Sequence, residues 1–298
     1  MYKQNPERMY VTFWGIRGSI STPGSGTEKY GGNTPCVSVH HDSTDIVLDA
    51  GTGIRNFGLE LAKQVRTSKS KMHVHVLLSH THWDHIQGLP FFAPAYAKDV
   101  KLSIYGSPKK GNFLGAVLQG QMDVNYFPVA MDAFSADLSI TEFAEPTIQI
   151  GSISVDWEEQ ICHPGGSVRY RLKAGGKKVV YATDVELNKI FVKNQSSSQK
   201  ALARAYENFI AEADLLIADG QYTEKEYPLR VNWGHTSMQI LIDAARRARV
   251  RQLAIFHHDP QHSDRILDNL ATVIGPKYNK GSHPMNIFWA REGMTIAV

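Results

Sequence analysis

The sequence predicts an α/β (α+β) fold in which two β-sheets pack together and helices cover their outer faces. Two observations lead to this class. Short apolar runs bounded by Gly, Pro and Asp, which are typical of strands, alternate with segments whose apolar residues recur at helical spacing. Strands outnumber helices early in the chain and helices are interspersed throughout, which favours two covered sheets. We treat residues 1–298 as a single domain because neither half has a complete core pattern by itself.

The N-terminal part of the chain supplies the first series of strands. Residues 54–65 have apolar side chains at helical spacing and predict the first helix. The strands that we expect around this helix are 9–14, 36–39, 46–48, 74–78 and 101–105. Residues 111–145 then lack a regular pattern and include a kink at 126–128, so we interpret this insert as a loop or a lid.

The rest of the chain predicts a second series of strands, interrupted by three helices. We expect these strands at 147–155, 156–162, 168–173, 178–182, 215–218, 252–256, 287–290 and 294–298. We expect the helices at 200–212, 237–248 and 264–274. Strands followed by helices in this order complete a second covered sheet.

Composition excludes several classes of protein. The chain has 32 Lys and Arg against 29 Asp and Glu, and a net charge of +3 is too small to indicate nucleic-acid binding by itself. Two cysteines, Cys36 and Cys162, do not make a disulfide framework, so a reducing compartment fits. The N-terminus lacks the apolar segment of a signal peptide, and no apolar run approaches the roughly 18 residues of a membrane span. These features predict a cytoplasmic enzyme with no membrane partner.

The strongest functional signal is the run His80-Thr81-His82-Trp83-Asp84-His85, which directly follows a predicted strand. Imidazole nitrogen and carboxylate oxygen together suit zinc and other borderline divalent ions. Residues two apart at the end of a strand point the same way, so His80 and His82 would bind one ion. Where the chain then turns into a helix, Asp84 and His85 would face a neighbouring ion.

Four residues cannot complete two metal sites, so further ligands must come from elsewhere in the chain. His163, Asp184 and His257 each follow the end of a predicted strand, where a rigid sheet positions loops for function. His258 is an alternative to His257, which we prefer because it is the first residue beyond the apolar strand. The sequence therefore predicts a two-metal site but does not by itself assign these residues to particular ions.

The run HTHWDH resembles the HxHxDH signature of metallo-β-lactamase-fold hydrolases. The resemblance covers nearly the whole chain and is greatest to the phosphodiesterase branch, which includes tRNase Z and the cyclic-phosphate phosphodiesterases. Four further motifs of this branch have similar counterparts, namely Asp49-Ala50-Gly51-Thr52, Cys162-His163-Pro164, Tyr181-Ala182-Thr183-Asp184 and Trp233-Gly234-His235-Thr236-Ser237.

The resemblance implies a four-layer αβ/βα sandwich with a dinuclear centre at one edge between the sheets. One metal ion would be bound by His80, His82 and His163. The other would be bound by Asp84, His85 and His257, and Asp184 would bridge the two. We expect two divalent ions, with zinc as the first choice and manganese or iron as alternatives, because imidazole and carboxylate ligands accept all three.

Two metal ions about 4 Å apart suit in-line displacement at phosphorus. The expected reaction is the attack of a metal-bound hydroxide on a phosphodiester, with Asp84 also orienting the nucleophile. His235 is the candidate proton donor for the leaving oxygen, as the resemblance to tRNase Z implies. Asp219 would orient His235, although the tRNase Z pattern usually has glutamate at this position.

The substrate that we expect is a small or cyclic nucleotide-type phosphodiester. The insert carries five acidic residues and follows only two lysines, Lys109 and Lys110, and an acidic insert repels an RNA backbone. Its acidic residues are Asp123, Asp132, Asp137, Glu142 and Glu145. Tyr126 and Phe127 would either close over a nucleobase or pack the insert onto the body. Processing of the tRNA 3′ end, with RNA as partner, is the first alternative.

Two other functional classes fit the same fold. A thioesterase similar to glyoxalase II is one alternative. A diiron redox protein is the other, but such relatives usually carry an acidic residue where this chain has His82. Related enzymes are commonly dimers, so the resemblance also implies a homodimer.

Overall fold

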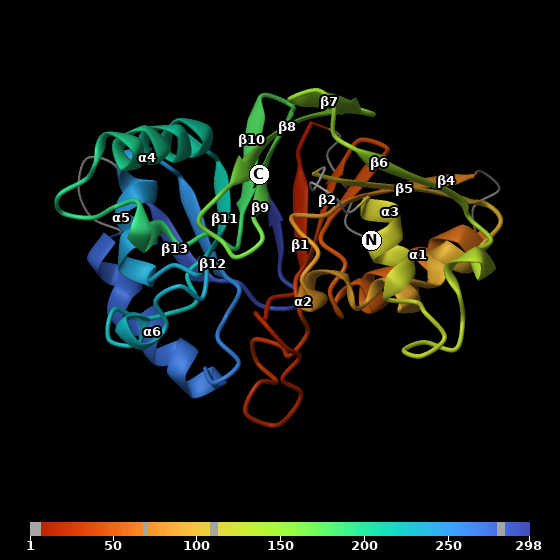
Figure 1. The fold of residues 1–298 in the computed structure, drawn as a ribbon, viewed down its shortest axis with the longest axis horizontal. Helices are drawn as coiled ribbons and strands as arrows, with labels where there is room; N and C mark the ends of the chain where they lie inside the picture. The colour runs from red at the N-terminus through yellow and green to blue at the C-terminus, as the bar shows by residue number, and fades with distance from the viewer. Residues whose placement is uncertain (1–6, 68–70, 108–112, 279–283) are drawn as a thin grey trace.

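The computed structural model describes residues 7–67, 71–107, 113–278 and 284–298 and contains two seven-stranded sheets that face each other (Figure 1). Its strands are β1 (Tyr10–Gly15), β2 (Cys36–His41), β3 (Thr44–Leu48), β4 (Met72–Leu77), β5 (Val100–Gly106), β6 (Asp137–Glu142), β7 (Thr147–Ile150), β8 (Ile153–Gln160), β9 (Ser167–Ala174), β10 (Lys177–Ala182), β11 (Leu215–Asp219), β12 (Gln252–Phe256), β13 (Asn286–Trp289) and β14 (Thr295–Ala297).

Apart from α2, the α-helices lie on the outer side of each sheet (Figure 1). The α-helices are α1 (Ile54–Thr67), α2 (Trp83–Ile86), α3 (Leu114–Gly120), α4 (Ser197–Ile210), α5 (Met238–Arg247) and α6 (Asp264–Tyr278). Short 3-10 helices are η1 (Leu89–Phe91), η2 (Ala93–Tyr96), η3 (Met131–Ala133), η4 (Leu187–Lys189) and η5 (Tyr227–Leu229). No helix in the described part of the chain is both long and apolar enough to cross a membrane.

The two sheets have related topologies. The first has the order β14-β1-β2-β3-β4-β5-β6, antiparallel from β14 to β3 and parallel from β3 to β6. The second has the order β13-β12-β11-β10-β9-β8-β7, parallel from β13 to β10 and antiparallel from β10 to β7. Consecutive parallel strands present their carboxyl ends at one edge, so loops that follow them are brought together there.

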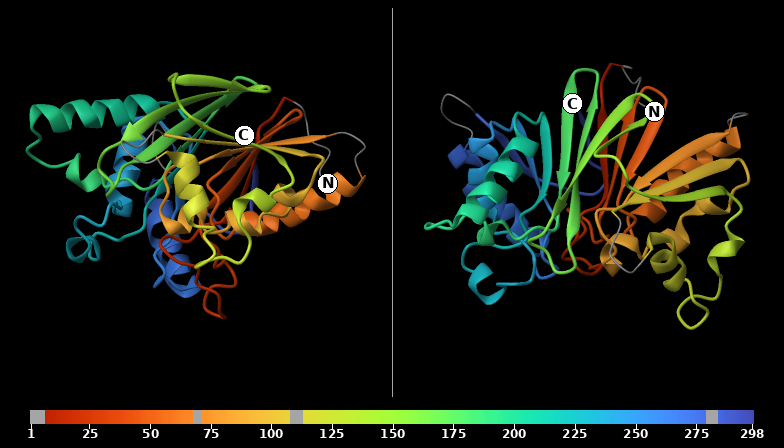
Figure 2. Two further views of the ribbon diagram at one scale, coloured as in Figure 1. Left: turned by 45° about the vertical axis from the view of Figure 1, so that its right-hand side comes forward. Right: turned by 45° about the horizontal axis from the view of Figure 1, so that its top comes forward.

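The core has one layer between the sheets and one beneath the first sheet. Between the sheets, Phe13 of β1 and Phe256 of β12 bring their ring centroids within 6.2 Å. Beneath the first sheet, Phe57 of α1 and Leu118 of α3 pack with Val76 of β4. The remaining helices, α4, α5 and α6, cover the second sheet, and the turned views of Figure 2 show the same order of layers. The predicted α/β arrangement of two sheets with helices outside is confirmed.

The prediction that residues 111–145 are irregular is wrong for much of this insert. Of its described residues, 114–120 form α3 and 137–142 form β6, the edge strand of the first sheet; residues 111 and 112 lie outside the described part. Helix α3 is too short to give a periodic signal, and β6 is half exposed along its length, so neither has a clear apolar pattern. A lid remains a prediction only for the connection between them.

The prediction of one strand over 147–155 is also wrong. The chain forms a hairpin there, in which Gly151 separates β7 from β8. Gly151 has a φ of +52°, and a Cβ at this position would lie 2.1 Å from Thr44 Oγ1. The turn therefore depends on the missing side chain of a glycine that the apolar pattern on both sides conceals.

Two hydrogen bonds join the end of β4 to β9 of the opposite sheet. The backbone N–H of Val168 donates to Ser79 O at 2.8 Å, and the buried Tyr170 hydroxyl donates to Leu78 O at 2.5 Å. Since Leu78 and Ser79 directly precede His80, these bonds fix the strand end that carries the histidine run.

Replacement of Tyr170 by Phe should lower the free energy of unfolding by about 1–2 kcal/mol, because the buried Leu78 carbonyl loses a donor. Urea unfolding followed by circular dichroism would measure the change. Tyr126→Phe is the matched control, since the Tyr126 side chain is 80% exposed. Equal stability of Tyr170→Phe and the wild type would contradict this role for the hydroxyl.

Candidate metal centre

The metal-competent side chains of the histidine run converge between the two sheets, where His80, Asp84 and His85 are buried and His82 is exposed. His80 lies in the loop after β4, and Asp84 and His85 lie on α2. The ligand atoms of His80, His82 and His163 all lie within 4.8 Å of one another. His163 comes from the loop after β8, so this group of three imidazoles is made by both sheets.

A second group has Asp84, His85 and His257 at its corners. Asp84 Oδ2 lies 3.3 Å from His85 Nε2 and 3.2 Å from His257 Nε2, and the two Nε2 atoms lie 3.3 Å apart. His257 is the first residue after β12. The structure thus brings together, as two separate groups, the six residues that the sequence resemblance assigned to two ions.

Asp184 lies between the two groups. Its Oδ1 is 3.9 Å from the Nε2 atoms of both His80 and His163, and 3.4 Å from His257 Nε2. Its Oδ2 is 3.3 Å from His85 Nε2. One carboxylate that reaches imidazoles of both groups has the position expected of a bridging ligand.

Hydrogen bonds on the far side of the imidazoles determine which nitrogen faces the centre. His163 Nδ1 donates to Gly234 O at 3.0 Å, and His85 Nδ1 donates to Asp49 Oδ2 at 2.7 Å. Because these acceptors hold a proton on Nδ1, Nε2 is the nitrogen of each ring that would present a lone pair to a bound cation. His80 Nε2 is buried and has no hydrogen-bond partner among the described residues.

The charges of the cluster fit a bound cation. Burial lowers the pKa of His80 and His163, and burial with the neighbouring His163 lowers the pKa of His82 to about 4, so these rings are neutral and could bind a cation. Although burial opposes it, Asp84, Asp184 and Asp49 raise the pKa of His85 well above its usual value. Converging lone pairs and three buried carboxylates together form a donor set that suits divalent ions.

Several residues of the centre have an unusual backbone conformation. Asp49, Asp184 and His257 have φ values of 63°, 57° and 59°, and Ser19 has a φ of 65°. The left-handed region is uncommon for residues other than glycine and is concentrated at functional sites. At Asp184 and His257 it occurs just beyond the ends of β10 and β12, where the chain turns and the side chain enters the cluster.

Asp49 connects the cluster to both sheets. This fully buried carboxylate follows β3 and accepts hydrogen bonds from Ser79 N at 2.6 Å and Ser79 Oγ at 2.8 Å. It also accepts from His85 Nδ1 and from the Tyr181 hydroxyl of the opposite sheet, both at 2.7 Å. Asp49 begins the motif Asp49-Ala50-Gly51-Thr52, whose resemblance to a family motif implies a structural aspartate. The contacts of Asp49 agree with this structural role.

His235 and Asp219 form a pair beside the cluster. His235 Nδ1 lies 2.8 Å from Asp219 Oδ2 and 3.7 Å from Asp184 Oδ1. Burial opposes a positive charge on His235, but the Asp219 carboxylate outweighs it and raises the pKa of His235 to about 9. Burial raises the pKa of Asp219 as well, and the neighbouring His235 opposes that rise.

Sequence reasoning missed two contacts of the loop after β1. Ser19 N donates to Asp84 Oδ2 at 2.8 Å, which orients a proposed ligand from a distant part of the chain. A Cβ on Gly18 would lie 2.3 Å from His257 Nδ1, so only glycine lets the loop approach this ring. Arg17-Gly18-Ser19 has the composition of an ordinary turn, and its glycine was the only signal for this role.

The loop that carries His235 is held by a residue that sequence reasoning did not single out. Glu186 is fully buried and accepts hydrogen bonds from the Tyr227 hydroxyl at 2.7 Å, Asn232 N at 2.8 Å and Gly234 N at 3.2 Å. Its position two residues after Asp184 was the only available signal. Through Gly234, whose carbonyl accepts from His163, this carboxylate links the loop to the centre.

Other candidates lie away from the centre. His258, the alternative to His257, donates from Nε2 to Ala290 O at 2.8 Å. Phe127 makes an edge-to-face contact with Phe91, with centroids 5.3 Å apart, which fits packing of the insert onto the body. Tyr126 is 80% exposed.

Comparison with known proteins agrees with this geometry. Residues 44–258 match the family model of the beta-lactamase superfamily domain. Three solved structures share the fold over almost the whole chain. Yeast PDE1 matches with a TM-score of 0.70 and 15% identity, and the match covers 98% of this chain and 99% of that one. The metallo-beta-lactamase fold protein YhfI from Bacillus subtilis matches with a TM-score of 0.66 and 18% identity, over 98% of this chain and 100% of that one. The short form of human tRNase Z matches with a TM-score of 0.61 and 16% identity, over 96% of this chain and 98% of that one. No curated protein sequence matches significantly. The predicted metallo-β-lactamase fold is confirmed.

Replacement of Asp49 by Asn should weaken the binding of metal by about 10- to 100-fold, since an amide no longer fixes His85 with its lone pair toward the centre. Calorimetric titration of the metal-free protein with zinc would measure the affinity. Asp45→Asn is the matched control because Asp45, on the strand that precedes Asp49, pairs with the half-buried His40 at 2.8 Å. A folded Asp49→Asn variant with unchanged zinc affinity would remove Asp49 from this role.

Proposed function

Because the chain belongs to the beta-lactamase superfamily, we propose that it is a metal-dependent phosphodiesterase that hydrolyses small or cyclic nucleotide-type phosphodiesters. One observation carries the choice of reaction: the buried pair of His235 and Asp219 stands beside a cluster suited to two metal ions. A phosphodiester places two demands on a site, which are charge neutralisation at the phosphate and a proton for the leaving oxygen. The cluster and the pair are suited to meet one demand each.

The proposal assigns the ligands as two groups. His80, His82 and His163 would hold one ion. Asp84, His85 and His257 would hold the other, with Asp184 reaching both. When bound, two divalent ions activate water near neutral pH and neutralise charge on the phosphate oxygens. Zinc is the ion that we propose, with manganese or iron as alternatives for the same ligands.

The chain itself would supply orientation and a proton. Asp84, held through Oδ2 by Ser19 N, would orient the attacking water as well as bind metal. His235 donates through Nδ1 to Asp219, so the proton available to a leaving oxygen would be held at Nε2. The Asp219 carboxylate, which outweighs the effect of burial, would keep the proton on the imidazole until the substrate is bound.

The His235 pair distinguishes between reactions that the same fold supports. An alkoxide that leaves a phosphodiester is strongly basic and needs a proton. A thiolate leaves without one, because the pKa of a thiol is about 8.5. A thioesterase similar to glyoxalase II therefore has no use for a raised-pKa imidazole at this place, and the pair favours the phosphodiesterase.

Charge in the insert favours a small substrate over tRNA. Its acidic residues Asp123 and Asp132 are exposed, and acidic surface weakens binding of an RNA backbone. Glu142 has a structural role, since its Oε1 accepts from Leu114 N at the start of α3. Human tRNase Z and yeast PDE1 share the fold at low identity, so both kinds of substrate belong in a test. A homodimer and a cytoplasmic location are also part of the proposal.

Metal-loaded protein should hydrolyse 3′,5′- or 2′,3′-cyclic nucleotides and lose this activity when a chelator removes the metal. The panel should include a pre-tRNA and a glutathione thioester, with zinc, manganese and iron measured in each preparation. Cleavage of the pre-tRNA alone, or of the thioester alone, would refute the proposed substrate class. A coloured diiron centre with no hydrolysis would instead support a redox protein.

His235→Ala should lower kcat for a cyclic nucleotide by about 10²–10⁴-fold, because the leaving oxygen loses its proton donor. The metal content per chain should stay at the wild-type value, which elemental analysis would measure. His40→Ala is the control, as His40 lies on β2 and pairs with Asp45. Loss of one metal equivalent in His235→Ala would show that His235 is a ligand, and full activity would exclude it from the reaction.

A further inference from the structure

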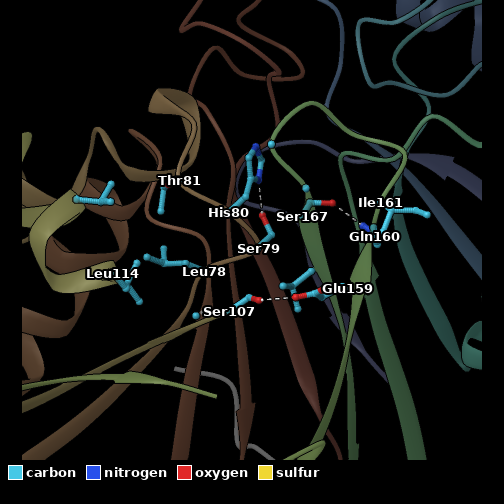
Figure 3. A pocket seen from close by; sticks show the side chains of 15 residues that line it. Leu78, Ser79, His80, Thr81, Ser107, Leu114, Glu159, Gln160, Ile161 and Ser167 are labelled. Carbon is cyan, nitrogen blue, oxygen red and sulfur yellow. Dashed lines mark hydrogen bonds between the residues drawn. The ribbon is translucent and has the colours of Figure 1, made fainter. Parts of the chain in front are cut away.

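A cavity of about 490 Å³ lies between the two sheets beside the metal centre (Figure 3). Its walls come from the ends of β4 and β5, from α3, and from β8, β9 and the loop between them. His80 belongs both to this wall and to the group of three imidazoles. In Figure 3 the ring of His80 extends away from the cavity, so the cavity and the centre lie on either side of this segment. The volume is within the roughly 300–1,000 Å³ that is typical of small-molecule sites.

Near α3 the cavity is lined mainly by apolar side chains, whereas polar side chains such as Ser79, Ser107 and Gln160 line other parts of it. Leu78 and Leu114 are buried, while Val117 and Thr81 are half-buried. An apolar lining of this kind binds a flat or compact apolar body, such as a heterocyclic ring, by removing it from water. Backbone of the Gly165-Gly166 turn forms the opposite wall.

One carboxylate lies at the polar side of the cavity. Glu159 of β8 faces the first sheet, and the Ser107 hydroxyl, just after β5, donates to its Oε1 at 3.2 Å across the gap between the sheets. Figure 3 shows the two side chains meeting below His80. No lysine or arginine of the described residues forms an ion pair with Glu159, so the second oxygen of this carboxylate remains available as an acceptor.

We propose that this cavity binds the organic group of the phosphodiester, and that Glu159 selects a heterocycle that carries an N–H donor, such as the exocyclic amine of adenine. The inference rests on the proposed function and specifies its substrate class. The ring would lie among Leu78, Leu114 and Val117 while its phosphate faces the centre beyond His80. The amine would donate to Glu159, which Ser107 holds in place.

The charge of Glu159 also limits the substrate. Glu159 is exposed, so solvent weakens its charge, but a carboxylate at this place still repels a second phosphate on the same group. The cavity therefore favours a diester with one phosphate and a neutral base over an RNA chain, whose neighbouring phosphates follow one another along the backbone. This distinction does not depend on the acidic residues of the insert.

Binding tests this inference independently of hydrolysis. The probe is the adenosine 3′,5′-cyclic phosphorothioate, compared by calorimetry with the matching purine analogue that lacks the amine. Glu159→Ala should weaken binding of the adenine compound about tenfold or more and leave the other nearly unchanged, since only the first donates to a charged acceptor. Glu159→Gln should fall between the wild type and Glu159→Ala, because its amide oxygen still accepts.

A second variant tests the apolar wall. Val117→Phe should weaken both ligands, because the larger side chain fills the space of the ring. Two control variants should bind both ligands as the wild type does. One is Val273→Phe on α6, where the side chain is 57% exposed, and the other is Glu145→Gln in the exposed turn before β7.

The outcomes separate this inference from the proposed function. Three results would overturn the cavity as the base site. They are no binding of the ligands to the wild type, equal losses of affinity for both ligands in Glu159→Ala, and unchanged affinity in Val117→Phe. Hydrolysis of bis(p-nitrophenyl) phosphate by the metal-loaded wild type tests the reaction alone. If the phosphorothioate binds as expected and no diester is hydrolysed, the proposed function fails while the binding site stands.

Discussion

The buried carboxylate of Asp49 is the constraint on which the rest of the centre depends. It is fully buried, no lysine or arginine of the described residues pairs with it, and its charge is stabilised by neutral donors and one imidazole. Removal of a charge from water is costly unless such donors surround it. Because the donors come from Ser79, His85 and Tyr181, the same contacts fix the end of β4, the orientation of a proposed ligand and the approach of the second sheet.

This arrangement makes the centre a property of both sheets. The loop after β4 and helix α2 contribute His80, His82, Asp84 and His85, while the second sheet and its loops contribute His163, Asp184, Asp219, His235 and His257. Neither set contains both proposed groups by itself. The converging lone pairs also repel one another without a cation, so binding of metal and close packing of the sheets stabilise each other.

Local patterns predict much of this site, whereas long-range contacts escape them. The ligand candidates were found because metal-competent side chains stand directly after apolar strands, as at Asp184 and His257. Ser19 and Glu186 were missed because they act through hydrogen bonds to distant parts of the chain, 65 positions away for Ser19 and up to 48 positions away for Glu186. The edge strand β6 was missed because an edge strand that is half exposed has no apolar alternation.

The position of His235 follows from the same balance of charges and bears on the choice of reaction. Two carboxylates, Asp219 and Asp184, face this imidazole, and their combined field exceeds the cost of its burial, so the proton is held where a leaving oxygen would need it. The loop that carries His235 is in turn fixed by Glu186 through Gly234. Burying the Asp219 carboxylate is costly, and the hydrogen bond from His235 offsets part of that cost. The same contact leaves Nε2 of His235 as the nitrogen that would serve the proposed transfer of a proton to a basic leaving group.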